Sequence, residues 1–188
     1  MDQELRDRLH RLPDVRLFGP VNDALLTTFL YSFGQACLEG KDPVVELMTD
    51  GGVADYGYRI SEEVRAAEAS FGVKPIFLGK TSVFSAGVTI MSGFAPERRY
   101  LAPNTTLLIH ERRTTKDVHI TGQIGASIQV ARELVAELEA GLRVQNEGFA
   151  RLVEGTDVSY EEVLQRASTG WYVPAQEALD RGLVAGIL

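Results

Sequence analysis

Short apolar runs along the chain alternate with longer segments in which apolar residues recur every three or four positions. The runs with the length and composition of buried strands are residues 16–18, 44–48, 76–78, 99–101, 106–109 and 184–188. Helical spacing follows the run at 16–18, over residues 23–39. It also follows the run at 44–48, up to about residue 69. This alternation is typical of an α/β fold, in which helices cover a mainly parallel sheet.

The first of these helices carries signals at both ends. Asn22 precedes it and is a favoured N-cap residue, while Gly40 follows it and suits a helix C-terminus. The apolar face predicted for this helix consists of Leu26, Phe29, Leu30, Phe33 and Cys37. Cys37 lies within that stripe, so we expect a buried thiol.

The middle and end of the chain contain three further predicted features. Gly79 is expected to open a loop after the strand at 76–78, and residues 85–94 are small and apolar, like a buried helix. The polar segment 111–125 reads as a long loop or an exposed hairpin. Residues 126–152 keep helical spacing, and a helix of about 27 residues is about 40 Å long. It should therefore protrude from so small a domain or pack on a partner chain.

Length and charge narrow the classes of protein. The chain has 188 residues, which predicts a single domain covering residues 1–188. It has 19 Lys and Arg against 26 Asp and Glu, and this acidity argues against binding to nucleic acids or anionic membranes. The single cysteine excludes an internal disulfide and a zinc finger. Neither a signal peptide nor a membrane-spanning apolar run is evident, so a cytoplasmic location is predicted.

Three separate stretches could carry chemistry. Gly51 and Gly52 follow a strand, where glycine permits close approach to a substrate but also serves ordinary turns. Ser85 begins the small apolar helix, either as an N-cap or as a nucleophile whose oxyanion the Ala86 N–H stabilises. His110 ends an apolar strand, where a histidine is usually an ordinary polar residue. We expect His10 and His119 to be solvated.

Two other motifs near Ser85 are weaker. Residues 79–82 (GKTS) resemble the end of a phosphate-binding loop, but Lys74 stands where that motif requires glycine. Lys80 could act as a base for Ser85, yet an exposed loop lysine stays protonated at neutral pH. We expect neither a cofactor nor a metal.

Together these features resemble the proteolytic subunit of the Clp protease (ClpP), a family of serine peptidases. The resemblance covers residues 18–188, and its most specific parts are residues 99–110 (RYLAPNTTLLIH) and 175–184 (AQEALDRGLV). It implies the ClpP/crotonase fold of repeated β-β-α units, with the long helix as a protruding handle. It also implies polypeptide substrates, stacked rings of identical subunits and a separate ATPase that unfolds substrates.

The resemblance assigns roles to four residues. Ser85 falls on the nucleophile and His110 on the general base, while Gly52 and Ala86 fall on the two backbone donors of the oxyanion hole. One position departs from the family, because an ungapped alignment puts Arg166 where the third catalytic residue, an aspartate, is expected. A guanidinium cannot accept the imidazole N–H. Asp157, Glu161 and Glu162 are acids nearby.

Three functions therefore fit the sequence. The first is a serine endopeptidase with an unusual third group at its active site. The second is a weak or inactive ring subunit, which the arginine at position 166 suggests. The third is a crotonase-like enzyme acting on acyl-CoA thioesters, which shares the fold and the two-amide oxyanion hole without the Ser-His pair.

Overall fold

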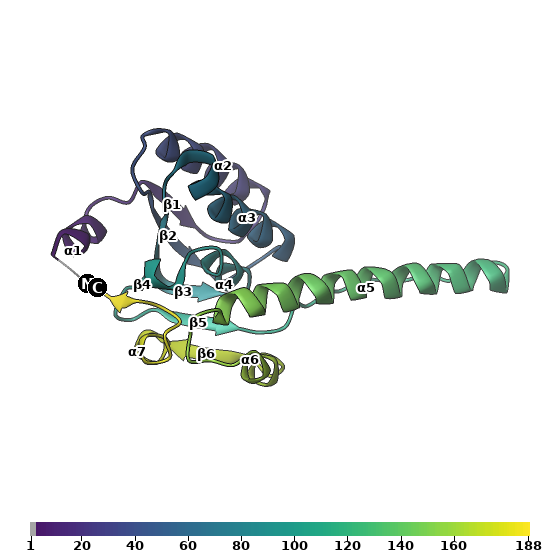
Figure 1. Cartoon of the computed structure of the whole chain (residues 1–188). Coiled ribbons are helices and arrows are strands. Elements are labelled where there is room, and N and C mark those ends of the chain that lie inside the picture. Colours follow the sequence, from purple (N-terminus) through teal and green to yellow (C-terminus); the bar gives the residue numbers. More distant parts are fainter. Residues whose placement is uncertain (1–2) are drawn as a thin grey trace.

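The computed structural model describes residues 3–188 and combines a central sheet with helices and one long projecting helix (Figure 1). In chain order its elements are α1 (Gln3–His10), β1 (Val15–Phe18), α2 (Asp23–Leu38), β2 (Val44–Thr49), α3 (Ala54–Phe71), β3 (Ile76–Phe84), α4 (Ala86–Met91), η1 (Pro96–Arg98), β4 (Arg99–Leu101), β5 (Thr106–Ile109), α5 (Ile124–Val153), α6 (Tyr160–Ala167), β6 (Trp171–Pro174), α7 (Ala175–Asp180) and β7 (Gly186–Ile187).

The strands within residues 3–188 form one seven-stranded sheet, which confirms the predicted α/β class. Strands β1, β2, β3, β4 and β7 pair in that order and are all parallel. The first half of β3 pairs with β4 and its second half pairs with β5. Strand β6 then adds to β5 in the antiparallel direction. The carboxyl ends of β3 and β5 therefore lie side by side.

Strand β3 corrects the prediction of a loop at Gly79, because the strand continues to Phe84. A Cβ atom on Gly79 would lie 2.6 Å from Leu101 Cδ2 and 2.9 Å from Val83 Cγ2. Glycine at this position thus permits close packing within the sheet instead of forming a turn. The strand bends two residues later at Thr81, which has a φ of 61°.

Helix α2 has the predicted ends and most of the predicted buried face. The Leu25 N–H donates to Asn22 Oδ1 at 3.0 Å, and Gly40, just past the helix, has a φ of 71°. The side chains that it buries are Leu25, Phe29, Phe33, Ala36 and Cys37. Leu30 is 40% exposed, so its place in the predicted stripe was wrong. It follows Phe29 and therefore points about 100° away around the helix. Burial raises the pKa of Cys37 to about 11.

Helix α5 spans 30 residues and projects far beyond the sheet, as its length predicted (Figure 1). Only Phe149 and Leu152, near its C-terminal end, are buried. Several apolar side chains along the projecting part are exposed: Ile124, Ile128, Val130, Val135, Leu138 and Leu142. The segment before the helix, residues 110–122, contains no helix or strand, which resolves the choice between loop and hairpin.

Candidate active site

Ser85 lies in a strained turn between β3 and α4, with φ 55° and ψ −115°. Positive φ is unusual for a residue other than glycine and occurs often at functional sites. Its main-chain N–H donates to the Leu108 carbonyl at 2.8 Å, which fixes the turn to β5. Its side chain makes no capping hydrogen bond. The hydroxyl is therefore not used as the N-cap that the sequence left open.

The Gly51–Gly52 loop lies directly against Ser85. A Cβ atom on Gly51 would be 2.8 Å from Ser85 Cβ and 3.3 Å from Ser85 Oγ. Two main-chain hydrogen bonds of 2.8 Å hold the loop to Val21: Val21 N–H donates to the Gly51 carbonyl, and Val53 N–H donates to the Val21 carbonyl. Among the hydrogen bonds of residues 3–188, none uses the N–H of Gly52 or of Ala86.

His110 follows β5 immediately, and its ring borders the same pocket as Ser85 and Ala86. This pocket has a volume of about 60 Å³. Its other lining residues are mainly apolar and include Val88, Ile109, Val144, Phe149 and Leu152. The structure thus brings Ser85, Ala86 and His110 together. A direct hydrogen bond between Ser85 and His110 is not among the contacts of the described part of the chain.

A hydrogen bond of the His110 ring favours one of its two neutral tautomers. Nδ1 lies 2.6 Å from the carbonyl oxygen of Glu111. A carbonyl oxygen can only accept a hydrogen bond, so Nδ1 carries the proton. In the neutral ring Nε2 is then unprotonated and free to accept a proton. The hydrogen bonds of residues 3–188 include none between this ring and a carboxylate.

The side chain of Arg166, which an ungapped alignment puts at the third catalytic position, binds other residues than His110. Ile109 pairs with Trp171 at the end of the antiparallel β5–β6 ladder, so His110 and Gly170 each lie one residue beyond this last pair. The guanidinium of Arg166 instead lies 4.2 Å from the Trp171 ring centroid and 3.2 Å from Glu177 Oε1.

The nearby acids do not take the missing role. Glu162 binds Arg181 through both carboxylate oxygens, at 3.1 and 2.6 Å. These hydrogen bonds lower the pKa of Glu162 below its usual value. Asp157 and Glu161 contribute no hydrogen bond to the His110 ring in the part of the chain that the structure describes.

Two polar residues that the sequence analysis missed also line this pocket. Arg112 binds Asp55 through two hydrogen bonds of 2.7 and 2.9 Å, which raise the pKa of Arg112. The Arg112 main-chain N–H donates to Gln145 Oε1 at 2.6 Å. The three residues come from a loop and two separate helices, so no spacing in the sequence relates them.

Lys80 does not contact Ser85. Its Nζ atom lies 2.6 Å from Glu46 Oε2, in a carboxylate that is only 4% exposed. Lys80 therefore serves as the counter-ion of a buried glutamate on the neighbouring strand, which agrees with its dismissal as a base.

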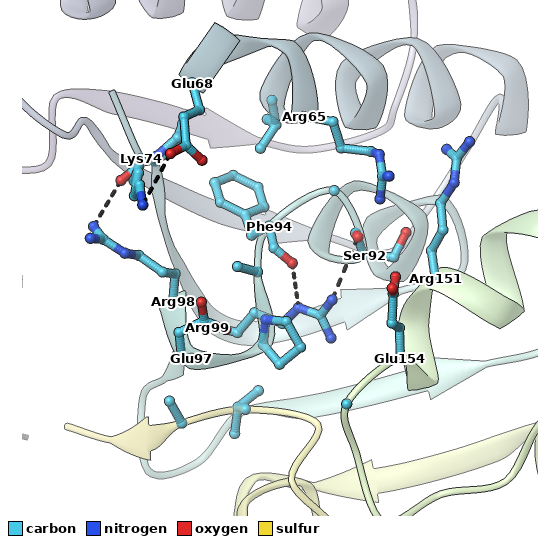
Figure 2. Close-up of a pocket in the computed structure, with 18 of the residues that line it drawn as sticks. Arg65, Glu68, Lys74, Ser92, Phe94, Glu97, Arg98, Arg99, Arg151 and Glu154 are labelled. Carbon is cyan, nitrogen blue, oxygen red and sulfur yellow. Dashed lines mark hydrogen bonds and ion pairs between the residues drawn. The ribbon is translucent and has the colours of Figure 1, made fainter. Parts of the chain in front are cut away.

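A larger cavity than the Ser85 pocket lies elsewhere, beside the C-terminal end of α5, and has a volume of about 760 Å³ (Figure 2). Arg99 at its base is buried, and its guanidinium donates to the carbonyls of Phe94 and Leu152 at 2.9 and 3.0 Å. Burial lowers the pKa of Arg99 to about 10. Lys74 at the rim pairs with Glu68 at 3.0 Å. These charges brace the fold, so volume alone does not make this cavity the active site.

Metal-binding clusters and membrane-spanning helices are both missing from the described part of the chain. Residues 3–188 contain no group of three or more His, Cys, Asp or Glu side chains arranged to hold a metal ion. None of the helices described is both long and apolar enough to cross a membrane.

The chain is similar to known proteins in both sequence and fold. A model of the Clp protease family matches residues 3–188. ATP-dependent Clp protease proteolytic subunit 2 of Gluconobacter oxydans is 28% identical over 98% of this chain and 78% of its own length. The ATP-dependent Clp protease proteolytic subunit of Streptococcus sanguinis is 26% identical over 98% and 86%. The structure of a ClpP1 point mutant from Listeria monocytogenes is 21% identical, has a TM-score of 0.76, and is matched over 99% of this chain and 94% of that one.

Proposed function

The chain belongs to the Clp protease family, and on this premise we propose that it is a serine endopeptidase whose nucleophile is Ser85. The observation that carries the proposal is the single pocket bordered by Ser85, Ala86 and His110. The Gly51–Gly52 loop against Ser85 completes the set of groups that acyl transfer requires.

Each group has a defined part in the proposed reaction. Nε2 of His110 takes the proton of the Ser85 hydroxyl while Oγ attacks the carbonyl carbon of the peptide bond. The N–H groups of Gly52 and Ala86 donate to the oxygen that becomes negative. His110 then passes the proton to the leaving amine, and an acyl-enzyme remains. Water, deprotonated by His110, attacks the acyl group, and collapse of the second tetrahedral intermediate returns the proton to Ser85 and releases the acid.

The proposal is tested at Gly170, which like His110 lies one residue beyond the last pair of the β5–β6 ladder. A Cβ atom there has only Leu108 Cδ1 within 4 Å, at 3.7 Å. The φ of 87° at Gly170 is strained for any residue with a side chain, but aspartate and asparagine adopt such a conformation more readily than most residues. We expect the natural protein to hydrolyse a short fluorogenic peptide, and Gly170→Asp to raise kcat at least about tenfold, because loss of an orienting carboxylate costs up to about 10⁴ in related chemistry.

The control for this variant is Gly170→Asn, which has nearly the same shape and no charge, and which should give a smaller gain. Activity that appears only in Gly170→Asp, with none in the natural protein, would favour the inactive ring subunit instead. Tight binding of coenzyme A together with full turnover by a Ser85→Ala variant would favour the crotonase-like reaction.

We also propose that copies of this chain assemble through their α5 helices, in the way that two rings of subunits interlock in the Clp protease family. Leu138 and Leu142 on its projecting part are 48% and 53% exposed, and water contact of such side chains is unfavourable. Replacing both by aspartate should reduce the particle to smaller species in sedimentation velocity. Arg143→Asp, a change at an exposed position on the same helix, should leave the mass unchanged. Equal masses for all three proteins would contradict assembly through this face.

The remaining partners follow from the family. The curated relatives are named as subunits of an ATP-dependent protease. This chain lacks a complete phosphate-binding loop at residues 74–81, so we propose that a separate ATPase unfolds and delivers its polypeptide substrates. The proposed location is the cytoplasm, on the sequence evidence alone.

A further inference from the structure

A single peptide group connects the His110 ring with a side chain on α5. The carbonyl oxygen of Glu111 accepts from His110 Nδ1 at 2.6 Å. The N–H of the same peptide group, which belongs to Arg112, donates to Gln145 Oε1 at 2.6 Å. The result is a continuous chain of hydrogen bonds from the imidazole ring, across one peptide bond, to an amide side chain.

This arrangement strengthens and orients the contact with the ring. When a peptide N–H donates a hydrogen bond, its carbonyl oxygen becomes a better acceptor, and such chains gain roughly 10–30% per bond. Two further contacts hold the segment on either side. The Glu111 N–H donates to the Ala167 carbonyl at 3.2 Å, and the Arg112 guanidinium binds both carboxylate oxygens of Asp55. The peptide group therefore has little freedom to rotate.

Gly170, which like His110 lies one residue beyond the last pair of the β5–β6 ladder, has no side chain to offer the ring. The peptide carbonyl is thus the acceptor that the described residues supply to Nδ1. This carbonyl oxygen carries only a partial negative charge. Its effect on the His110 ring therefore depends on the carbonyl group staying aligned with the Nδ1–H bond. Gln145 is the side chain that accepts from the other end of this group.

We propose that Gln145 is a positioning residue, which acts through the peptide group between Glu111 and Arg112 to keep His110 in its Nδ1-protonated tautomer. The inference rests on the proposed function in one respect, because the value of this tautomer lies in leaving Nε2 free as the base. Gln145 itself does not exchange protons with substrate.

Two variants of Gln145 separate this role from packing. Gln145→Leu removes the acceptor, and kcat for a fluorogenic peptide should fall about 10-fold to 100-fold with KM changed less than threefold. That range matches the loss of outer hydrogen bonds that orient metal-bound histidines. Gln145→Glu keeps an acceptor at the same place, and its kcat should equal or exceed that of the natural protein. Gln176→Leu, in α7, should have no effect, because Gln176 is exposed and its side chain donates to Asp180.

The state of the ring can be read without catalysis. Solid-state NMR of protein labelled with ¹⁵N-histidine has three pairs of ring nitrogen signals to assign, since the chain has three histidines. His110 should show a protonated Nδ1 and a bare Nε2 in the natural protein and in Gln145→Glu, and a mixture of tautomers in Gln145→Leu. An unchanged tautomer in Gln145→Leu would overturn the inference, as would an Nε2-protonated ring in the natural protein.

The two measurements distinguish failure of the inference from failure of the proposed function. If no variant hydrolyses peptides but the tautomer changes as stated, the positioning role stands and the peptidase proposal fails. If Gln145→Leu keeps full kcat and the natural tautomer, Gln145 has no positioning role whether or not the chain is a peptidase.

Discussion

Replacing Ser85 by alanine is expected to lower kcat/KM for peptide hydrolysis by at least about 10²-fold. In a complete triad, loss of the serine costs about 2 × 10⁶ in kcat and loss of the acid alone about 3 × 10⁴. A serine and histidine without any orienting group therefore keep an advantage of roughly 10². Because the peptide carbonyl of Glu111 orients the His110 ring, we expect kcat/KM to decrease by more than this factor. The size of the decrease measures how well a carbonyl group replaces a carboxylate.

The control for this prediction is Ser92→Ala, at the other end of α4. The Ser92 hydroxyl donates to the Thr89 carbonyl at 2.7 Å and does not line the Ser85 pocket. Initial rates with a fluorogenic peptide at saturating and low concentrations give kcat and kcat/KM for both variants. Hydrolysis by Ser85→Ala at the rate of Ser92→Ala would mean that the hydroxyl of Ser85 is not the nucleophile.

Gly52→Ala is expected to lower the free energy of unfolding by about 3 kcal/mol and to abolish hydrolysis in the protein that remains folded. A Cβ atom on Gly52 would lie 2.3 Å from the Val21 carbonyl oxygen and 2.8 Å from its nitrogen, both of them backbone atoms. Its φ of 150° adds strain, and strained positions cost about 1–3 kcal/mol each. Relieving this clash requires the backbone to move at Gly52, and the Gly52 N–H that is proposed to donate to the oxyanion moves with it.

Thermal unfolding followed by circular dichroism checks the stability part of this prediction. A loss of about 3 kcal/mol corresponds to a decrease in Tm of roughly 6–12 °C for a chain of this size. Gly34→Ala is the matched control, because Gly34 lies inside α2 and a Cβ atom added to it would have no atom within 4 Å. That change should stabilise the helix by about 0.5–1 kcal/mol. Equal Tm values for the two variants would contradict the packing described for the glycine loop.

The sequence predicted the order of strands and helices well, because the local signals for each element agree with the residues that the fold buries. The alternation of strands and helices, the cap at Asn22, the buried Cys37 and the length of α5 all follow from the apolar pattern. Gly79 misled the prediction, since glycine is used for turns and for close packing, and only contact with Leu101, on the neighbouring strand β4, decides between them. The prediction for Leu30 was wrong because a helix face shifted by one residue is nearly as apolar as the predicted one.

The candidate site was predictable only where a family motif covers it. Ser85, His110 and the glycine loop were assigned by resemblance, and the fold brings Ser85 and His110 to adjacent strand ends. Gln145 and Arg112 carry no local signal, because their roles depend on where a loop without regular structure lies against α5. The contacts of Arg166 with Trp171 and Glu177 were not predictable either, because they depend on how α6, β6 and α7 pack together.

The central claim is that the Ser85 hydroxyl, the His110 ring and the amides of Gly52 and Ala86 act together as one acyl-transfer centre. Reaction of the assembled protein with a fluorophosphonate, followed by mass spectrometry of its peptides, tests this most directly. We predict an adduct on Ser85 that forms at least about tenfold faster than in a His110→Ala variant, consistent with general-base catalysis worth roughly 10²–10⁴. An unmodified Ser85, or equal rates in both proteins, would contradict the claim.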